Sequence, residues 1–547
     1  MKFIIAFIFL VSLLLINQPV EPGMACPLST FGISLIIDVA EYESISVEQV
    51  LDKLCSYLPS EMSLVCEEYI NKYAELLIEE LKTDDHPDSL ARKIGLCPMD
   101  SQCTLFPSDK KMNFKKNSKS RYSNKDTKVS QNSKSVWESI LDELKKIYEK
   151  HDPIVDLDGD HFSDTRKLRG SNWRGKDCDD LNRSTFPGKV PNSGDKLFDS
   201  NCNGIHGRDE NKINYEDKFC KGTQPMTTMV IGDSIGAHFH IPVQFLQADQ
   251  LSNGVLKDNL IELLEMEGDW PQKSWATGFD LTPNDMCEGD VNSIYLKMLE
   301  RNQCNHRNYV NIAVNGMSSA GVYDLLKSSL IESIQKESYP VFGILQLFGD
   351  DICIADNITQ LPTPQQFREN MVKALHKLDS VVAPGSVFFL MSLLDGTRPY
   401  NVLHDKIHPI GHGVTYADFY EYMKCTQISF CSLFLTTNIT EMLYVEKLAL
   451  KYTQQLKDIT ETEKFVNFDA KFLETPQKEL DELFIANGWD LTLIYEPVGG
   501  FHPTQLSNYW MAELIWKRIV TLYPEFVPPI NPHNKEIIQK FGDQGGY

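Results

Sequence analysis

A serine and a histidine far apart in the chain are the residues best suited to chemistry. Ser234 ends the string Ile231-Gly232-Asp233-Ser234, directly after Met229 and Val230. His502 lies in the string Gly499-Gly500-Phe501-His502-Pro503. A serine hydroxyl is a poor nucleophile until a neighbouring base takes its proton. The pair therefore predicts nucleophilic catalysis if the fold brings Ser234 and His502 together.

Three acidic clusters between residues 151 and 210 are typical of a cation site. In the first, from Asp156 to Asp164, carboxylates alternate along a loop with a glycine at its bend. Such carboxylates converge on one point, which favours a hard cation with oxygen ligands, Ca²⁺. The alternative is a solvated acidic loop. The predicted ligands are Asp156, Asp158, Asp160, Phe162, Asp164, Asp177, Asp179, Asp180, Asn182, Asp199, Asn201 and Asn203. The second cluster runs from Asp177 to Asn182 and the third from Asp199 to Gly204. A disulfide between Cys178 and Cys202 could join these two clusters.

Apolar runs that suit strands alternate with helical stretches over residues 220–547. They predict strands at 229–231, 309–314, 341–348 and 386–391. This alternation is typical of an α/β domain with a parallel sheet and covering helices. Turn residues follow these runs at their carboxyl ends, where α/β folds place their ligands. Ser234 follows the first run.

Composition and charge bound the remaining possibilities. The chain has 547 residues, 13 cysteines and a formal net charge of −23. So acidic a chain argues against nucleic acid as a partner. The apolar run from Phe3 to Ile16 has the length of a signal-peptide core, so residues 1–23 are predicted to be a signal peptide. With no later apolar segment long enough to span a bilayer, the sequence predicts an exported, soluble protein that is secreted or held in a lysosomal or phagosomal lumen.

The amino-terminal part, residues 24–105, has apolar residues at helical spacing, with Pro59 and Pro87 at expected helix boundaries. Its cysteines and helical segments resemble a saposin-like, lipid-interacting domain. The resemblance implies the disulfides Cys26–Cys97 and Cys55–Cys66, and it leaves Cys103 free to bond to the rest of the chain. The alternative is a generic helical hairpin.

Residues 106–150 differ in composition from their neighbours on both sides. They contain lysines among Ser and Asn residues and begin with few apolar side chains. A stretch of this kind cannot repay the entropy of ordering and is a natural protease target. The sequence therefore predicts a basic linker, and proteolysis there would yield two chains.

Four blocks in the carboxyl-terminal part resemble those of the GDSL, or SGNH, hydrolase family. In chain order they contain Ser234, Gly316, Asp350 and His502. The resemblance implies that Ser234 is the nucleophile, that His502 is the base, and that the N–H groups of Ser234 and Gly316 bind the oxyanion. The third block, Gly349-Asp350-Asp351, has Asp350 where the family has an asparagine donor. An ionised carboxylate there would repel the oxyanion, so Asp350 must be protonated, turned away or replaced by a neighbouring donor.

The acid that orients the base also departs from this family. Gly499 stands three residues before His502, where the family has an aspartate. The orienting acid must then come from another position. The candidates are Glu496, Asp469, Asp490 and Asp405. A group of histidines, His404, His408 and His412, is a further candidate for lining the cleft.

The order of signal peptide, saposin-like domain, basic linker, acidic segment and GDSL-like domain resembles the order found in the acyloxyacyl hydrolase family. It implies an all-α saposin-like domain, a calcium-binding loop segment and a three-layer SGNH-type α/β domain. It further implies removal of secondary fatty acyl chains from the lipid A of bacterial lipopolysaccharide by disulfide-linked small and large subunits, with the saposin-like domain contacting a membrane or micelle surface. The alternatives are a phospholipase or general lipase, and a lipid-binding homologue with impaired catalysis.

Overall fold

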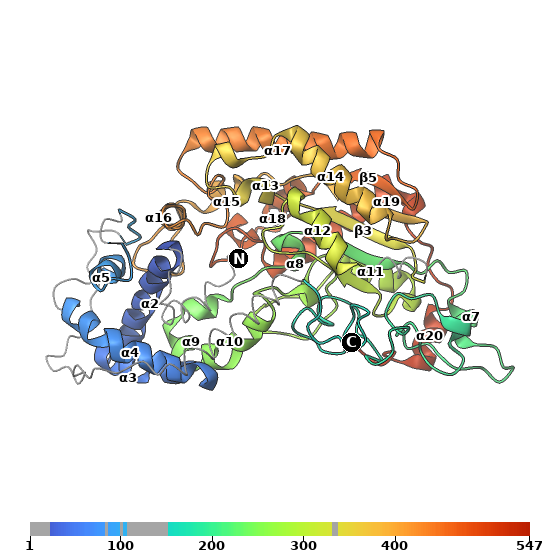
Figure 1. The fold of residues 1–547 in the computed structure, drawn as a ribbon, viewed down its shortest axis with the longest axis horizontal. Helices are drawn as coiled ribbons and strands as arrows, with labels where there is room; N and C mark the ends of the chain where they lie inside the picture. Colours follow the sequence, from blue (N-terminus) through green and yellow to red (C-terminus); the bar gives the residue numbers. More distant parts are fainter. Residues whose placement is uncertain (1–21, 82–85, 99–101, 107–150, 331–336) are drawn as a thin grey trace.

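The computed structural model describes residues 22–81, 86–98, 102–106, 151–330 and 337–547 (Figure 1). The predicted signal peptide and basic linker lie almost wholly outside these ranges. No helix within them is long and apolar enough to cross a membrane.

A parallel sheet of five strands, in the order β2-β1-β3-β4-β5, forms the centre of the larger part of the chain. The strands are β1 (Thr227–Gly232), β2 (Tyr309–Asn311), β3 (Val341–Gln346), β4 (Ser386–Met391) and β5 (Phe468–Leu473). Every residue of β1, β3 and β4 is buried. Because successive side chains of a strand point to opposite faces, both faces of the sheet are covered. The predicted α/β fold is confirmed.

The helices that cover this sheet also pack against one another. Helices α12, α14 and α17 pack in sequence, and α17 also contacts β4 and β5; α11 contacts α19 and β1. In Figure 1, α17 and α14 lie above the strands. The α-helices after residue 210 are α7 (Tyr215–Phe219), α8 (Ser234–Ala237), α9 (Ala248–Ser252), α10 (Val255–Glu265), α11 (Ile294–Arg301), α12 (Ser319–Ser329), α13 (Asp350–Cys353), α14 (Pro364–Asp379), α15 (Arg398–Leu403), α16 (Tyr416–Cys425), α17 (Ile439–Thr462), α18 (Gln477–Ala486), α19 (Gln505–Leu522) and α20 (Asn534–Phe541).

The amino-terminal part is all-α. Its helices are α2 (Pro22–Tyr42), α3 (Val47–Leu54), α4 (Ser60–Glu80) and α5 (Pro87–Lys93). Helix α4 starts directly after Pro59 and α5 starts at Pro87, as the sequence predicts. The disulfides Cys26–Cys97 and Cys55–Cys66 are both present, so the predicted pairing is confirmed.

Helix α2 and the segment around Cys103 join this helical part to α16. The ring of Phe31 lies 6.1 Å from that of Phe419, and the Tyr422 hydroxyl donates to Thr30 Oγ1 at 2.8 Å. Cys103 is bonded to Cys425, which confirms that it bridges to the larger part of the chain. The helical part is therefore held against the α/β part by packing and by one covalent bond.

That arrangement gives the first prediction. Trypsin cleavage between residues 106 and 150 should yield two fragments that separate on a denaturing gel only after reduction. The reason is that, of the six disulfides among the described residues, only Cys103–Cys425 joins the two sides of the linker. In the double variant Cys103→Ser, Cys425→Ser, cleaved protein should separate without reductant. Fragments that stay joined in that variant would contradict the disulfide assignment.

The acidic segment before α7 covers the β2 edge of the sheet. The Asn311 N–H donates to the Trp173 carbonyl at 2.7 Å, and the Gly175 N–H donates to the Tyr309 carbonyl at 2.9 Å. These bonds pair backbone groups that the edge strand β2 would otherwise leave unpaired. The disulfide Cys178–Cys202 ties two loops of the segment together, as predicted.

Candidate active site

Ser234 is placed by a tight turn between β1 and α8. Gly232 ends β1, and a Cβ at this position would lie 2.0 Å from the Gln346 amide nitrogen, so only glycine fits. Asp233 caps the helix, accepting from the Ile235 N–H at 3.0 Å. Ser234 is then the first residue of α8, at the carboxyl end of the sheet.

Asp233 also fixes the turn to the next strand. Its carboxylate accepts hydrogen bonds from the Gln346 side chain at 3.0 Å and from the Phe348 N–H at 2.5 Å. Burial raises the pKa of Asp233 to about 6, against the opposing effect of these donors. The sequence marked this aspartate only as a turn residue, because its partners at the end of β3 are more than a hundred positions away.

The structure brings Ser234 and His502 together. His502 Nε2 lies 2.9 Å from Ser234 Oγ, and both side chains are buried. Burial, with a smaller contribution from His240, lowers the pKa of His502 to about 3, so the ring is neutral near pH 7. A neutral ring whose Nε2 faces the hydroxyl can accept its proton, which is the arrangement a serine nucleophile requires.

Glu496 holds the loop that carries His502 but does not bond to the imidazole. Its carboxylate accepts from the N–H groups of Val498 at 2.9 Å and Gly499 at 2.6 Å, and its own N–H donates to the His502 carbonyl at 2.7 Å. Burial raises the pKa of Glu496 to about 8. Nδ1 of His502 has no hydrogen-bond partner among the described residues. Glu496 therefore makes no hydrogen bond to the His502 ring, and its role as the acid that orients this ring stays a prediction.

Steric contacts explain why position 499 holds a glycine and not the aspartate of GDSL hydrolases. A Cβ on Gly499 would lie 2.5 Å from Glu496 Oε1 and 2.9 Å from the ring of Phe430. The space of a side chain at this position is occupied by the Glu496 carboxylate. The backbone bonds of Glu496 and the absence of an aspartate are thus two parts of one local arrangement.

None of the other candidate acids or histidines takes the place of that aspartate. Asp405 and Asp469 are exposed and lie beside lysines, and Asp490 caps a short 3₁₀ helix. His408 bonds to the Val498 carbonyl at 2.8 Å and thus supports the loop that bears His502. His404 bonds to a carbonyl of its own helix, and His412 bonds to Asp38 of α2. These hydrogen bonds hold the end of α15, the loop that bears His502, and the contact of α2 with the larger part of the chain.

The proposed oxyanion residues lie at the same edge of the sheet. Gly316 has φ +75°, a left-handed conformation that favours glycine, in the turn after β2. Beside it, the Asn315 amide donates to Asp269 at 2.8 Å. Asp350 begins α13 after β3, is 8% exposed, and lines the same pocket as Ser234.

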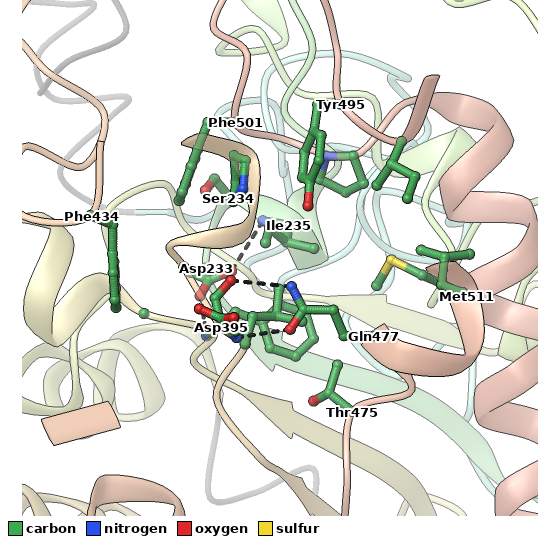
Figure 2. A pocket seen from close by; sticks show the side chains of 18 of the residues that line it. Asp233, Ser234, Ile235, Asp395, Phe434, Thr475, Gln477, Tyr495, Phe501 and Met511 are labelled. Atoms are coloured by element: carbon green, nitrogen blue, oxygen red, sulfur yellow. Dashed lines mark hydrogen bonds between the residues drawn. The ribbon is translucent and has the colours of Figure 1, made fainter. Parts of the chain in front are cut away.

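Ser234 lines a largely apolar pocket (Figure 2). Its walls include Phe348, Phe434, Leu480 and Met511, which come from four separate parts of the chain. Hydrocarbon is the chemical group that such walls stabilise best.

Carboxylates of the first and second acidic clusters converge, as the sequence predicts. Carboxylate oxygens of Asp156, Asp158 and Asp180 lie within 4.8 Å of one another, and so do those of Asp158, Asp160 and Asp177. Oδ2 of Asp158, Asp160 and Asp177 is buried without a hydrogen-bond partner among the described residues. Burial raises the pKa of Asp160 to about 8 and that of Asp177 to about 7. These residues fit a cation such as Ca²⁺.

The third cluster gathers around an acid that sequence reasoning missed. The amides of Asn201 and Asn203 donate to Glu216 of α7 at 3.1–3.2 Å, and Asp199 accepts from the N–H groups of Asn203 and Gly204. Burial raises the pKa of Glu216 to about 8. Two other predicted ligands, Asp164 and Asp179, do not belong to these convergent carboxylate groups. Phe162 could contribute only its backbone carbonyl, and the Asn182 amide bonds to Thr185 and Ser184.

Fold and site together define the class: a saposin-like domain followed by an SGNH-type α/β hydrolase. Residues 25–148 match the model of the family described as "Saposin-like domain". A human acyloxyacyl hydrolase is 34% identical over 548 residues, spanning 96% of this chain and 94% of its own. The mouse protein of the same name is 33% identical with the same coverage, and the rabbit one is 33% identical over 94% of this chain and 92% of its own. The chain belongs to the acyloxyacyl hydrolase family and is an ester hydrolase.

Proposed function

We propose that this protein removes secondary fatty acyl chains from the lipid A of bacterial lipopolysaccharide, with Ser234 as nucleophile and His502 as base. The observation that carries the proposal is the 2.9 Å contact between Ser234 Oγ and His502 Nε2, beside a largely apolar pocket that Ser234 lines. The names of the relatives support the choice of bond, since an acyloxyacyl group is a fatty acid esterified to the hydroxyl of another acyl chain.

The reaction then proceeds in two balanced halves. Ser234 Oγ attacks the ester carbonyl carbon while its proton passes to His502 Nε2. The imidazolium returns that proton to the leaving alkoxide as the ester C–O bond breaks, leaving an acyl-serine. Water attacks the acyl-serine by the same route, releasing the fatty acid and restoring Ser234. The N–H groups of Ser234 and Gly316 would bind the oxyanion, and each such donor typically contributes about 3 kcal/mol.

The test is a comparison of substrates. Purified protein is incubated with lipopolysaccharide and, separately, with phosphatidylcholine vesicles, and the released fatty acids are identified by mass spectrometry. The proposal predicts release of the secondary chains of lipid A, with the hydroxylated primary chains retained. Preferential release from phosphatidylcholine would favour a general lipase. Release from neither, together with no hydrolysis of a soluble ester, would favour a lipid-binding protein without catalysis.

Asp350 provides a second, independent prediction. Because GDSL hydrolases have an asparagine donor at the position that Asp350 matches, we expect Asp350→Asn to keep the rate of ester hydrolysis within about tenfold of wild type. Asp350→Ala removes any side-chain donor and should lose about 10²-fold or more in kcat. The measurement is kcat for a soluble short-chain ester. If alanine and asparagine variants behave alike, Asp350 supplies no donor to the oxyanion.

Glu496 gives a third prediction. We expect Glu496→Gln to lower kcat by about tenfold or less, since the glutamine side-chain oxygen still accepts a loop N–H and the carboxylate does not touch the imidazole. Loss of a true triad carboxylate costs about 10⁴-fold. A loss of that size at unchanged melting temperature would mean that Glu496 reaches His502 Nδ1 during the reaction.

The acidic clusters support a structural calcium site. Asp156, Asp158, Asp160, Asp177 and Asp180 would hold the ion, whose charge offsets their mutual repulsion. Asp199, Asn201 and Asn203, with Glu216, are candidates for a second.

Export to an extracellular, lysosomal or phagosomal compartment is supported by six disulfides, which persist where conditions are oxidising. Proteolysis of the linker would leave disulfide-linked small and large subunits. The saposin-like domain would contact the surface of the lipid aggregate, from lipopolysaccharide or phospholipid.

A further inference from the structure

Helix α16 presents two tyrosine hydroxyls to the loop that carries His502. The Tyr416 hydroxyl donates to the Pro497 carbonyl at 2.5 Å, and the Tyr420 hydroxyl donates to the Gly500 carbonyl at 2.6 Å. The two tyrosines are four positions apart, so they lie on one face of the helix. Burial raises the pKa of both hydroxyls, which therefore stay protonated and able to donate near pH 7.

The loop is fitted closely to these two side chains. Gly500 has φ +60°, and a Cβ at this position would lie 2.5 Å from the Tyr420 hydroxyl and 2.5 Å from the ring of Tyr416. Between the two tyrosine contacts, the Val498 carbonyl lies 2.8 Å from His408 Nε2. Three carbonyls of residues 497–500 are therefore bonded to side chains of α16 and of the loop before it.

The base depends on this loop for its orientation. Nδ1 of His502 has no hydrogen-bond partner among the described residues, so no acid there fixes the ring. The rings of Phe239 and Phe430 pack against it, with centroids 4.6 Å and 5.7 Å away. The place of Nε2 beside Ser234 Oγ is thus set by packing and by the backbone that carries the ring. A misplacement of 1 Å in such a pair can cost about 10²-fold in rate.

Helix α16 is itself held on a second face by the saposin-like domain. The ring of Phe419 stacks on His408 at 4.1 Å and on Phe31 of α2 at 6.1 Å. The disulfide Cys103–Cys425 adds a covalent bond at the end of the helix. Figure 1 shows α16 at the junction between the helical part and the α/β part. The tyrosines that hold the loop therefore stand on a helix that is anchored from both parts of the chain.

We infer that Tyr416 and Tyr420 are positioning residues of the reaction, which hold the 496–502 loop so that His502 Nε2 stays within reach of the Ser234 hydroxyl. Neither tyrosine touches the reacting atoms. Their bonds restrain the backbone of the base, where GDSL hydrolases use an aspartate on the ring. The inference rests on the proposed function, because it takes His502 to be the base.

The test uses tyrosine-to-phenylalanine variants, which delete a hydroxyl and keep the ring. Wild type, Tyr416→Phe, Tyr420→Phe and the double variant are assayed for kcat and KM on a soluble short-chain ester. The matched control is Tyr452→Phe. The Tyr452 hydroxyl donates to the Pro362 carbonyl, also at 2.5 Å, in the segment before α14, and its side chain is buried.

The double variant should lose about tenfold or more in kcat, with KM nearly unchanged, because the loop that carries the base gains freedom. Its rate of labelling by a fluorophosphonate, which needs the same pair of serine and base, should fall by a similar factor. The control should keep the wild-type kcat, although its melting temperature should fall about as much as that of either single variant.

A double variant with the same kcat as Tyr452→Phe overturns the inference, because the two hydroxyls would then contribute to stability alone. A higher KM at unchanged kcat overturns it as well. If circular dichroism shows that the double variant is unfolded, Tyr420→Phe decides, and a kcat equal to that of the control overturns the inference. Failure of the proposed function gives a different result: wild type would hydrolyse no ester, or His502→Ala would keep the wild-type activity.

Discussion

Replacing Ser234 with alanine should lower kcat for a soluble ester by about 10⁴-fold or more, because loss of the nucleophile removes the covalent route entirely. The melting temperature should change little. The serine hydroxyl bonds to His502, and the turn itself is held by Asp233, whose bonds to β3 do not involve the hydroxyl.

The matched control for that variant is Ser328→Ala. Ser328 lies on α12, and its hydroxyl bonds only to carbonyls of its own helix. This variant should keep wild-type kcat. Retention of more than a few per cent of activity by Ser234→Ala, in protein freed of wild-type contamination, would show that another residue is the nucleophile.

Removing calcium should produce the largest change in stability. A ligand at a hundred times its Kd stabilises the folded state by about 2.7 kcal/mol, and EGTA should remove that contribution. The buried, unpaired oxygens of Asp158, Asp160 and Asp177 would then face one another without a cation. The measurement is the melting temperature with calcium and with EGTA. No shift, with no metal found by elemental analysis, would contradict a calcium site.

The pH dependence of the metal-free protein follows from the same carboxyls. Burial raises the folded-state pKa of Asp160 to about 8 and of Asp177 to about 7, from about 3.9 in the unfolded chain. The folded state therefore binds more protons between these values, and its stability should fall as pH rises from about 4 to 8. With calcium bound this fall should disappear, because ligation requires the ionised carboxylates. Asp160→Asn should weaken the fall in EGTA and lose the response to calcium.

Much of the fold and site follows from local sequence. Four of five strands are marked by apolar runs, and Ser234 and His502 by their glycine-rich turns. The missed strand, β5, lies at the sheet edge, where its middle residues are partly or fully exposed. Its Asp469 and Lys471 interrupt the apolar pattern that identifies a buried strand.

The unpredicted parts of the site depend on contacts between distant segments. Nothing near Glu216 in the sequence shows that Asn201 and Asn203 turn their amides toward it. Likewise, the resemblance to GDSL hydrolases indicates that Gly499 stands where they have an aspartate, but not that the Glu496 carboxylate fills the space. In both cases a carboxyl bonds to neighbours in a way that only the folded chain defines.

The most direct test of the central claim is to locate an activated serine chemically. A fluorophosphonate reacts covalently with a serine whose proton has an acceptor. Peptide mass spectrometry of labelled protein should find the adduct on Ser234, and His502→Ala should abolish the labelling in protein that circular dichroism shows to be folded. An adduct on a different serine, or equal labelling of the His502 variant, would contradict the account.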